Sequence, residues 1–290
     1  MYSQIDANKR KSIFLVLIFI ALLTGIGWIL DNWLGYGPGA IVGAVGVSLV
    51  MTLISYYHGD TVALRSTGAR LIEKKDNAYV YNLVENLCIT AGLPVPKIHI
   101  IESPALNAFA TGRDPKHASI ALTTGIIQAL ENEELEGVIA HELSHVKNYD
   151  IRLMTIVIVL VGAVSLIANW FLHSNFRRSS DSDNRGGNIL AIAGLVLIIL
   201  SPIIAELIKL AVSRKREYLA DASGSLLTRY PEGLARALEK IQASTQPLTT
   251  ASTATAHLFI SNPFKGKSLT NLFSTHPPIA ERIKQLRGMA

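Results

Sequence analysis

Cysteine is almost absent from this chain of 290 residues, which contains only Cys88. A single cysteine excludes a disulfide framework within the chain and a zinc site built from cysteine thiolates. Charge is also scarce, because Asp, Glu, Lys and Arg make up 17% of the residues whereas apolar residues make up 49%. This composition is too apolar for an ordinary soluble domain and favours one soluble domain combined with membrane spans.

Charged residues are missing altogether from two long segments near the N-terminus. Ile13–Leu30 is long enough to cross the hydrocarbon core of a bilayer, and Ala40–Tyr57 follows it after a Gly37-Pro38-Gly39 turn. A cleaved signal peptide is the alternative for the first segment, but the run is long for one and no small-residue cleavage site follows it. We therefore expect a transmembrane hairpin over residues 1–57, placed in the cell (inner) membrane.

Basic residues are also missing from the short loop between these two segments, whereas Lys9, Arg10 and Lys11 cluster just before the first one. Because basic residues that flank spans stay on the cytoplasmic side, this asymmetry predicts that both ends of the hairpin face the cytoplasm. The net charge of +5 is modest. Its clustering beside apolar runs indicates membrane orientation rather than nucleic-acid binding.

A complete phosphate-binding loop is absent as well. Gly266-Lys267-Ser268 resembles the end of such a loop, but the glycine that the pattern requires earlier is replaced by Ser261. We therefore expect no use of ATP, which argues against an ATP-driven transporter or a membrane ATPase.

What the chain does contain is the motif His141-Glu142-Leu143-Ser144-His145. Apolar residues recur at helical spacing around it, which predicts a helix. Positions i and i+4 share one face of a helix, so His141 and His145 can direct ring nitrogens at one metal ion. Glu142 can reach the open coordination position as a general base. The motif therefore predicts one catalytic Zn²⁺ ion.

A catalytic zinc needs a third protein ligand, and Glu217 is the best candidate in the sequence. Asp221 follows it at i+4 on the expected helix, where it can accept a hydrogen bond from a ligand histidine and fix its tautomer. Two alternatives stay open. Glu217 can pair instead with Arg214 or Lys215 on a solvated helix face, and Glu206, at the end of an apolar run, is the second candidate ligand.

Two further apolar runs, Leu153–Leu172 and Ile189–Ile204, separate the motif from Glu217. His145 and Glu217 must lie on one side of the membrane to bind one ion, so either both runs cross the membrane or neither does. We expect residues 153–212 to contain two transmembrane helices.

The water-exposed catalytic part is expected to consist of residues 58–152 and 213–290. Its pattern is mixed α+β and mostly helical. The expected strands are Ile98–Ile101, Asn107–Ala110 and Ile120–Thr123, and the expected helices are Asn77–Ala91, Pro231–Ile241 and Pro277–Arg287. Residues 242–256 are rich in Ser, Thr and Ala without periodicity, which predicts a flexible loop over the site.

Together these features resemble the HtpX family of integral-membrane zinc metallopeptidases, which is related to the CAAX prenyl proteases. The resemblance covers nearly the whole chain, including the hairpin, the two later runs and four motifs. The motifs are Asn107-Ala108-Phe109-Ala110-Thr111, His141-Glu142-Leu143-Ser144-His145, Glu217-Tyr218-x-Ala220-Asp221 and Ser274-Thr275-His276-Pro277-Pro278. The resemblance implies a membrane-anchored gluzincin-type fold, a cytoplasmic active site, and degradation of damaged or misfolded membrane proteins under heat or envelope stress.

The same resemblance implies roles for residues outside the metal motif. Asn107-Ala108-Phe109 is similar to the edge strand with which gluzincins bind extended peptide, where main-chain pairing suits broad specificity. An ordinary strand is the alternative. His276 and Arg282 match positions near the site, where either can stabilise the oxyanion, although His276 before two prolines can equally be a turn residue.

The sequence thus predicts a zinc metalloendopeptidase whose partners are unfolded polypeptides, membrane-protein substrates and the lipid bilayer. Zinc would polarise the scissile carbonyl and acidify water, while Glu142 accepts a proton and passes it to the leaving amine. A membrane scaffold or chaperone with a structural zinc is one alternative, but a closed site needs a fourth ligand. A narrow-specificity processing protease is another alternative. By resemblance, it would need an intramembrane chamber built from more spans than the four apolar runs of this chain.

Overall fold

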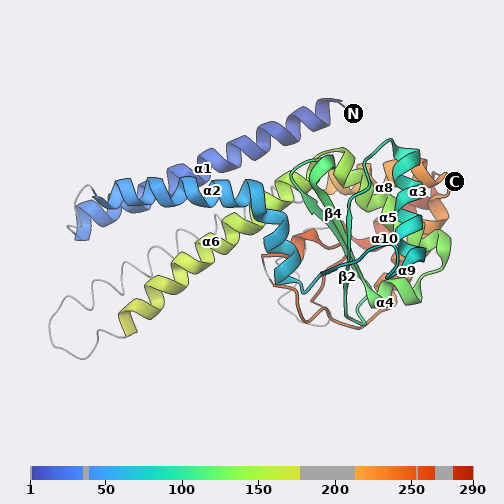
Figure 1. The fold of residues 1–290 in the computed structure, drawn as a ribbon. Helices are drawn as coiled ribbons and strands as arrows, with labels where there is room; N and C mark the ends of the chain where they lie inside the picture. Colours follow the sequence, from blue (N-terminus) through green and yellow to red (C-terminus); the bar gives the residue numbers. More distant parts are fainter. Residues whose placement is uncertain (1, 35–38, 177–212, 253, 265–276, 290) are drawn as a thin grey trace.

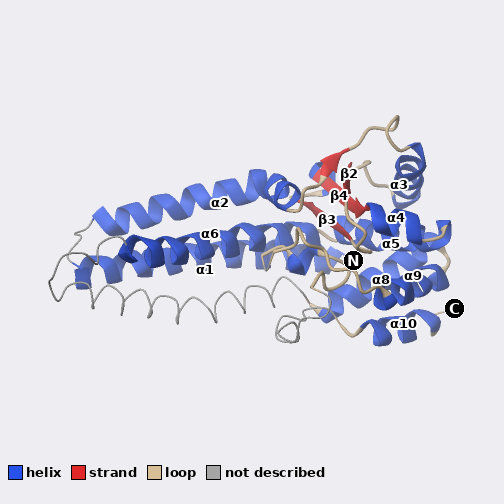
Figure 2. Ribbon diagram, turned by 90° about the horizontal axis from the view of Figure 1, so that it is seen from below, coloured by secondary structure: helices blue, strands red, loops and turns tan. Residues whose placement is uncertain are grey.

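Three long helices, α1 (Tyr2–Leu34), α2 (Gly39–Ser66) and α6 (Asp150–Phe176), extend from one side of a body that holds the other described elements (Figure 1). The computed structural model describes residues 2–34, 39–176, 213–252, 254–264 and 277–289. The start of α1 and the end of α2 lie beside the body in both views (Figure 2). The end of α1 and the start of α2 therefore lie far from the body.

Helices α1 and α2 are long and apolar enough to cross a membrane over Ile5–Trp28 and Ile41–Ser66, with mean hydropathies of 2.1 and 1.6. Many of their apolar side chains face outward; Ile13, Leu17 and Val42 are each more than half exposed. Exposed apolar surface of this extent is rare on proteins in water, whereas lipid chains accommodate it. Both apolar runs predicted near the N-terminus lie within these helices.

The third predicted run, Leu153–Leu172, lies in α6, and its first part packs against the hairpin. Leu160 of α6 shares a buried cluster with Phe19 of α1. An apolar seam thus joins α6 to the hairpin. The fourth run, Ile189–Ile204, lies outside the described residues, as does the alternative ligand Glu206.

A four-stranded sheet lies at the centre of the body, with the strand order β1-β2-β4-β3. The strands are β1 (Arg70–Leu71), β2 (Lys97–Ile101), β3 (Ala108–Gly112) and β4 (Ala118–Thr123). Strands β2 and β4 run parallel, whereas β3 pairs antiparallel with β4 and forms one edge of the sheet. Helices α5 and α6 pack against β3. The edge strand therefore lies beside the helix that carries the motif.

Most of the shorter helices lie on the side of the sheet that faces away from the long helices (Figure 1). They are α3 (Ala78–Ala91), α4 (Thr124–Ala129), α5 (Asn132–Lys147), α8 (Arg214–Thr228), α9 (Pro231–Ala243) and α10 (Ile279–Arg287). Their apolar faces and the sheet enclose one core, which includes Ile120, Leu122, Leu135, Ile139, Leu234 and Leu238. The structure confirms an α+β fold that is mostly helical, with the predicted strands and helices displaced by a few residues at most.

The motif helix α5 is held at the centre of this core. Its start is stabilised because the backbone N–H of Glu131 donates to the Glu134 side chain at 2.8 Å, and Lys240 of α9 donates to the same carboxylate at 2.7 Å. Gly137 lets α9 approach closely, since an added Cβ there would lie 2.7 Å from the backbone nitrogen of Leu234. The side chains of the motif are consequently surrounded by protein rather than by water.

Candidate metal centre

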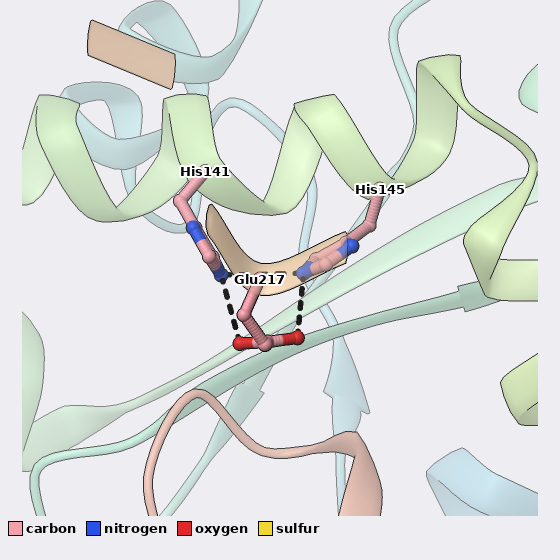
Figure 3. A group of neighbouring side chains, drawn as sticks. All are labelled: His141, His145 and Glu217. Atoms are coloured by element: carbon pink, nitrogen blue, oxygen red, sulfur yellow. Dashed lines mark hydrogen bonds and ion pairs between the residues drawn. The ribbon is translucent and has the colours of Figure 1, made fainter. Parts of the chain in front are cut away.

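The two histidines of the motif point their outer ring nitrogens toward each other from one face of α5 (Figure 3). The Nε2 atoms of His141 and His145 are 3.2 Å apart, and both side chains are buried. The two residues are four positions apart, so about one helical turn places them side by side. The motif thus forms a pair of adjacent donor atoms.

Glu217 reaches the same point from α8. Its carboxylate oxygens lie 3.8 Å from His141 Nε2 and 3.6 Å from His145 Nε2 (Figure 3). Helix α8 can approach α5 this closely because Gly224 faces the motif helix; an added Cβ there would lie 3.0 Å from the backbone nitrogen of His141. Glu217 therefore lies beside the two histidines, as predicted for the third ligand.

The three side chains form a donor set that fits a metal ion. One nitrogen from each histidine and one oxygen from Glu217 all lie within 4.8 Å of one another. A tetrahedral zinc ion, with bonds of about 2.0–2.1 Å, separates its ligand atoms by roughly 3.3 Å. The closest separations here are 3.2, 3.6 and 3.8 Å, so small side-chain movements suffice for binding. Three protein ligands also leave a position open for water or substrate.

Each histidine is held from behind by a carboxylate. Asp221 Oδ1 lies 2.9 Å from His141 Nδ1, and Asp150 Oδ2 lies 3.0 Å from His145 Nδ1. These contacts favour the ring proton on Nδ1 and leave Nε2 available to a metal. The sequence predicts Asp221 in this place but not Asp150, which is the first residue of α6. The missed signal was an acidic residue just beyond the motif helix.

Burial and neighbouring charges set the proton affinities of the two histidines. Burial opposes the charged form of His145, but the hydrogen bond to Asp150 and the charge of Glu217 outweigh it and raise the pKa of His145 to about 9. Burial lowers the pKa of His141, and the positive charge of Arg282 lowers it further against the opposing effect of Asp221. A metal ion that binds His145 must therefore displace a proton.

Glu142 lies in the same buried region, next to the edge strand. Burial raises the pKa of its carboxyl group to about 7, although the charge of His145 and a hydrogen bond from the backbone of Ala110 act in the opposite direction. A carboxyl group that titrates near neutral pH can both take up and release a proton. Its contact with the backbone of β3 and its closeness to His145 suit the predicted general base.

Arg282 of α10 is fully buried beside these groups. Its Nε and Nη2 atoms donate to the two carboxylate oxygens of Asp221 at 2.8 and 2.7 Å. Its Nη1 atom donates to the Ile260 carbonyl oxygen at 3.2 Å and lies 3.6 Å from an oxygen of Glu217. The guanidinium therefore connects α10 to α8 and also holds a peptide carbonyl next to the site.

The residues predicted to bind substrate are themselves buried, and they bind another segment of the chain. The backbone N–H of Ile260 donates to the Ala108 carbonyl oxygen at 3.0 Å. The Asn107 side chain donates to the Ser261 carbonyl oxygen at 3.1 Å and accepts a bond from the Ser261 N–H at 3.4 Å. The segment Phe259–Ser261 therefore lies along the outer edge of β3, where an added strand would lie.

Phe109 and His276 are the two remaining residues that the sequence predicts near the site. The Phe109 ring is buried and packs edge-to-face against the Phe259 ring, with the ring centres 5.1 Å apart. His276 lies outside the described residues. Phe109 thus contributes by packing its ring against the neighbouring segment Phe259–Ser261.

The chain is similar to a family of peptidases over most of its length. Residues 74–290 match the model of peptidase family M48. A protease HtpX homolog from Dictyoglomus thermophilum is 45% identical over 290 residues, which cover 99% of this chain and 94% of that protein. A protease HtpX homolog from Caldanaerobacter subterraneus subsp. tengcongensis is 44% identical over 294 residues, which cover 100% and 98%. Among solved structures, the crystal structure of S. mikatae Ste24p aligns with 99% of this chain and 67% of its own, at 20% identity and a TM-score of 0.48.

Proposed function

This chain belongs to peptidase family M48, and from that premise we propose that it is a zinc endopeptidase that cleaves misfolded or damaged membrane proteins. Family membership and the two membrane-capable helices make it a membrane metalloprotease that acts on polypeptides. The observation that carries the proposal is the convergence of His141, His145 and Glu217 within 4.8 Å, next to Glu142. The donor set of two imidazoles and one carboxylate supports zinc as the ion.

The residues of the chain supply orientation and proton transfer around the metal that these three ligands would hold. When bound, zinc would polarise the scissile carbonyl and make water more acidic. Glu142, which burial makes a better proton acceptor, takes the proton from the attacking water and passes it to the leaving amine. Asp221 keeps His141 in the tautomer that presents Nε2.

We further propose that peptide substrates bind along β3 in the place that Phe259–Ser261 occupies. Three groups predicted to contact substrate all bind this one segment: the Asn107 side chain, the Ala108 carbonyl and the Arg282 guanidinium. The contacts are almost entirely with its main chain, which suits recognition of many sequences. Once the segment leaves, Arg282 Nη1 is available to a substrate oxyanion, and we propose His276 as a second group with that role.

The cytoplasmic position of the active site is also a proposal. Lys9, Arg10 and Lys11 lie toward the end of α1 that is beside the body, whereas the far end of the hairpin has no basic residue. Basic residues stay on the cytoplasmic side, so the body is expected there. We propose that α1, α2 and the later apolar runs all cross the membrane. A peptidase held against the inner face can reach membrane proteins that fail to fold.

Proteolysis of an unfolded membrane protein by the purified full chain tests the function. Cleavage should stop when the metal is chelated and return when Zn²⁺ is restored. The matched variant Glu142→Gln should keep its zinc and lose cleavage by about 100-fold or more, because it removes the base and no ligand. Cleavage that survives complete removal of metal contradicts the metal assignment, and wild-type cleavage by Glu142→Gln contradicts the role of Glu142.

A further inference from the structure

The first membrane helix places a polar side chain inside the catalytic body. Asn8 lies near the start of α1, within the membrane-capable stretch Ile5–Trp28, and is 2% exposed. Its Nδ2 atom donates to Asp150 Oδ1 at 2.6 Å and to the Asn148 carbonyl oxygen at 3.0 Å. An amide buried at the end of an apolar helix is costly unless it is hydrogen-bonded, and these two bonds satisfy both of its N–H groups.

Asp150 joins this amide to the candidate metal centre. The carboxylate is 1% exposed, and its other oxygen, Oδ2, lies 3.0 Å from His145 Nδ1. Arg216, the residue before Glu217 on α8, brings its Nε atom to 3.6 Å from Asp150 Oδ1. A buried carboxylate needs such partners, because water cannot solvate it. Asp150 therefore connects α1 and α8 with the histidine that ends the motif.

The turn between α5 and α6, which contains Asp150, is also contacted by α1. Tyr149 adopts φ 60°, in the left-handed region that residues other than glycine rarely adopt. The residues on either side of it, Asn148 and Asp150, are the two that Asn8 binds. The Lys9 ammonium lies 4.8 Å from the centre of the Tyr149 ring. Asn8 and Lys9 of α1 thus contact all three residues of the turn, 148–150. This turn directs the Asp150 carboxylate toward His145.

We propose that Asn8 and Asp150 are positioning residues for the metal ligand His145, so that the first membrane helix completes the metal centre. The proposal rests on the proposed metal site. Asp150 accepts the Nδ1 proton of His145, which directs Nε2 toward the metal. Asn8 acts through Asp150 by fixing the orientation of its carboxylate. The membrane anchor is then part of the catalytic machinery as well as an attachment to the bilayer.

Metal binding to the full chain in detergent micelles tests this inference without measuring peptide cleavage. Co²⁺ serves as the probe, because its visible absorption reports both occupancy and ligand geometry. Asp150→Asn should weaken Co²⁺ binding by about 10- to 100-fold, as loss of a carboxylate behind a ligand histidine typically does. It should also shift the absorption bands. Asn8→Leu, of similar size, should weaken binding in the same direction by about tenfold or less.

Ser12→Ala is the matched control. Ser12 lies one turn further along α1 and is also buried, but among the described residues its hydroxyl bonds only to the Asn8 carbonyl within the helix. This variant should bind Co²⁺ like the wild type, with the same spectrum. Thermal unfolding of each metal-free protein, compared with its Co²⁺-loaded form, separates loss of metal affinity from loss of folding. For the two positioning variants, the stabilisation by Co²⁺ should shrink more than metal-free stability does.

The outcomes separate this inference from the proposed function. If the wild type binds no Co²⁺, the metal site itself is contradicted. If the wild type binds Co²⁺ and both Asp150→Asn and Asn8→Leu bind it with unchanged affinity and spectrum, only the positioning role is overturned. The positioning role is also overturned if the variants show a Co²⁺ spectrum of wild-type shape but lower amplitude and their metal-free stability falls in proportion. That result would show a purely structural role.

Discussion

At the scale of single residues, the centre consists of opposite charges buried against one another. His141 is backed by Asp221, which in turn holds the Arg282 guanidinium through two parallel bonds. Removing one partner of such a buried pair leaves an uncompensated charge that the interior cannot solvate. Asp221 neutralises Arg282, and its proposed second task is to orient the metal ligand His141. The proposed task of Glu217 is mainly to bind the metal ion directly.

These tasks predict different consequences for two alanine variants. Glu217→Ala should abolish most metal binding, because it removes one of three ligands. Asp221→Ala should weaken metal binding by about 10- to 100-fold. It should also lower the free energy of unfolding by about 3–5 kcal/mol, because Arg282 loses its main partner. Metal titration and denaturant unfolding of the metal-free proteins measure the two effects.

The control for this pair is Arg282→Met, which removes the guanidinium while largely keeping the volume. In the Arg282→Met background, Asp221→Ala should cost much less folding stability than it does alone, because the two losses share one interaction. If Glu217→Ala keeps wild-type metal affinity, the assignment of Glu217 fails and Glu206 becomes the ligand to test.

At the scale of secondary-structure elements, β3 is an edge strand whose outward polar groups are used within the chain. The Ala108 carbonyl binds Ile260, the Ala110 backbone binds Glu142, and the Gly112 N–H bonds to the Thr155 hydroxyl of α6 at 3.1 Å. A covered edge cannot pair with another strand, which protects the protein from aggregation. It also means that a peptide can pair with β3 only after Phe259–Ser261 has moved.

Hydrogen exchange of the inactive Glu142→Gln variant tests this requirement. Saturation with an unfolded peptide substrate should speed exchange at the Ile260 and Ser261 amides, since they lose their bonds to Ala108 and Asn107. The β4 amides, which pair with the inner edge of β3, should exchange at an unchanged rate and serve as the internal reference. Unchanged protection of Ile260 and Ser261 at saturating peptide contradicts binding along β3.

At the scale of the whole molecule, the long helices and the body form one structure rather than a domain on a tether. Helix α1 contributes apolar surface toward lipid through Ile13 and Leu17, and a buried amide toward the body through Asn8. Helix α6 begins at Asp150 beside the candidate metal centre and then packs against α1. Direct contacts therefore join the membrane part to the catalytic part.

Site-directed labelling tests the orientation of this assembly. Ser66→Cys places a thiol at the exposed end of α2 beside the body, and Asn32→Cys places one at the exposed far end of α1. A membrane-impermeant maleimide added to intact cells should label position 32 and not position 66, because the basic cluster keeps the body in the cytoplasm. Membranes opened on both sides should label both positions.

Cys88 provides a built-in check on this labelling experiment. Its side chain is fully buried, and burial raises the pKa of the thiol to about 12, so little reactive thiolate is present. The unmodified chain should stay unlabelled under either condition. Labelling of position 66 from outside intact cells would overturn the cytoplasmic active site.

The sequence by itself determined the features that depend on short-range geometry. Two uncharged runs long enough to cross a bilayer core predict the hairpin, since only internally hydrogen-bonded helices are stable in lipid. The spacing of His141 and His145 predicts two donor atoms on one side of a helix, since the helical repeat brings i and i+4 together. Asp221 was found by the same rule, four positions after Glu217.

Tertiary structure alone decided which distant groups meet at the centre. The sequence named Glu217 as the best candidate for the third ligand but left Glu206 open; the close approach of α8 to α5 at Gly224 is what brings Glu217 to the histidines. Asn8 and Asp150 were missed because each looks ordinary within its own helix. Their roles arise only when α1 packs beside the α5–α6 turn. The covered edge of β3 is likewise a property of packing, because a burial pattern along a strand does not reveal which segment occupies its free side.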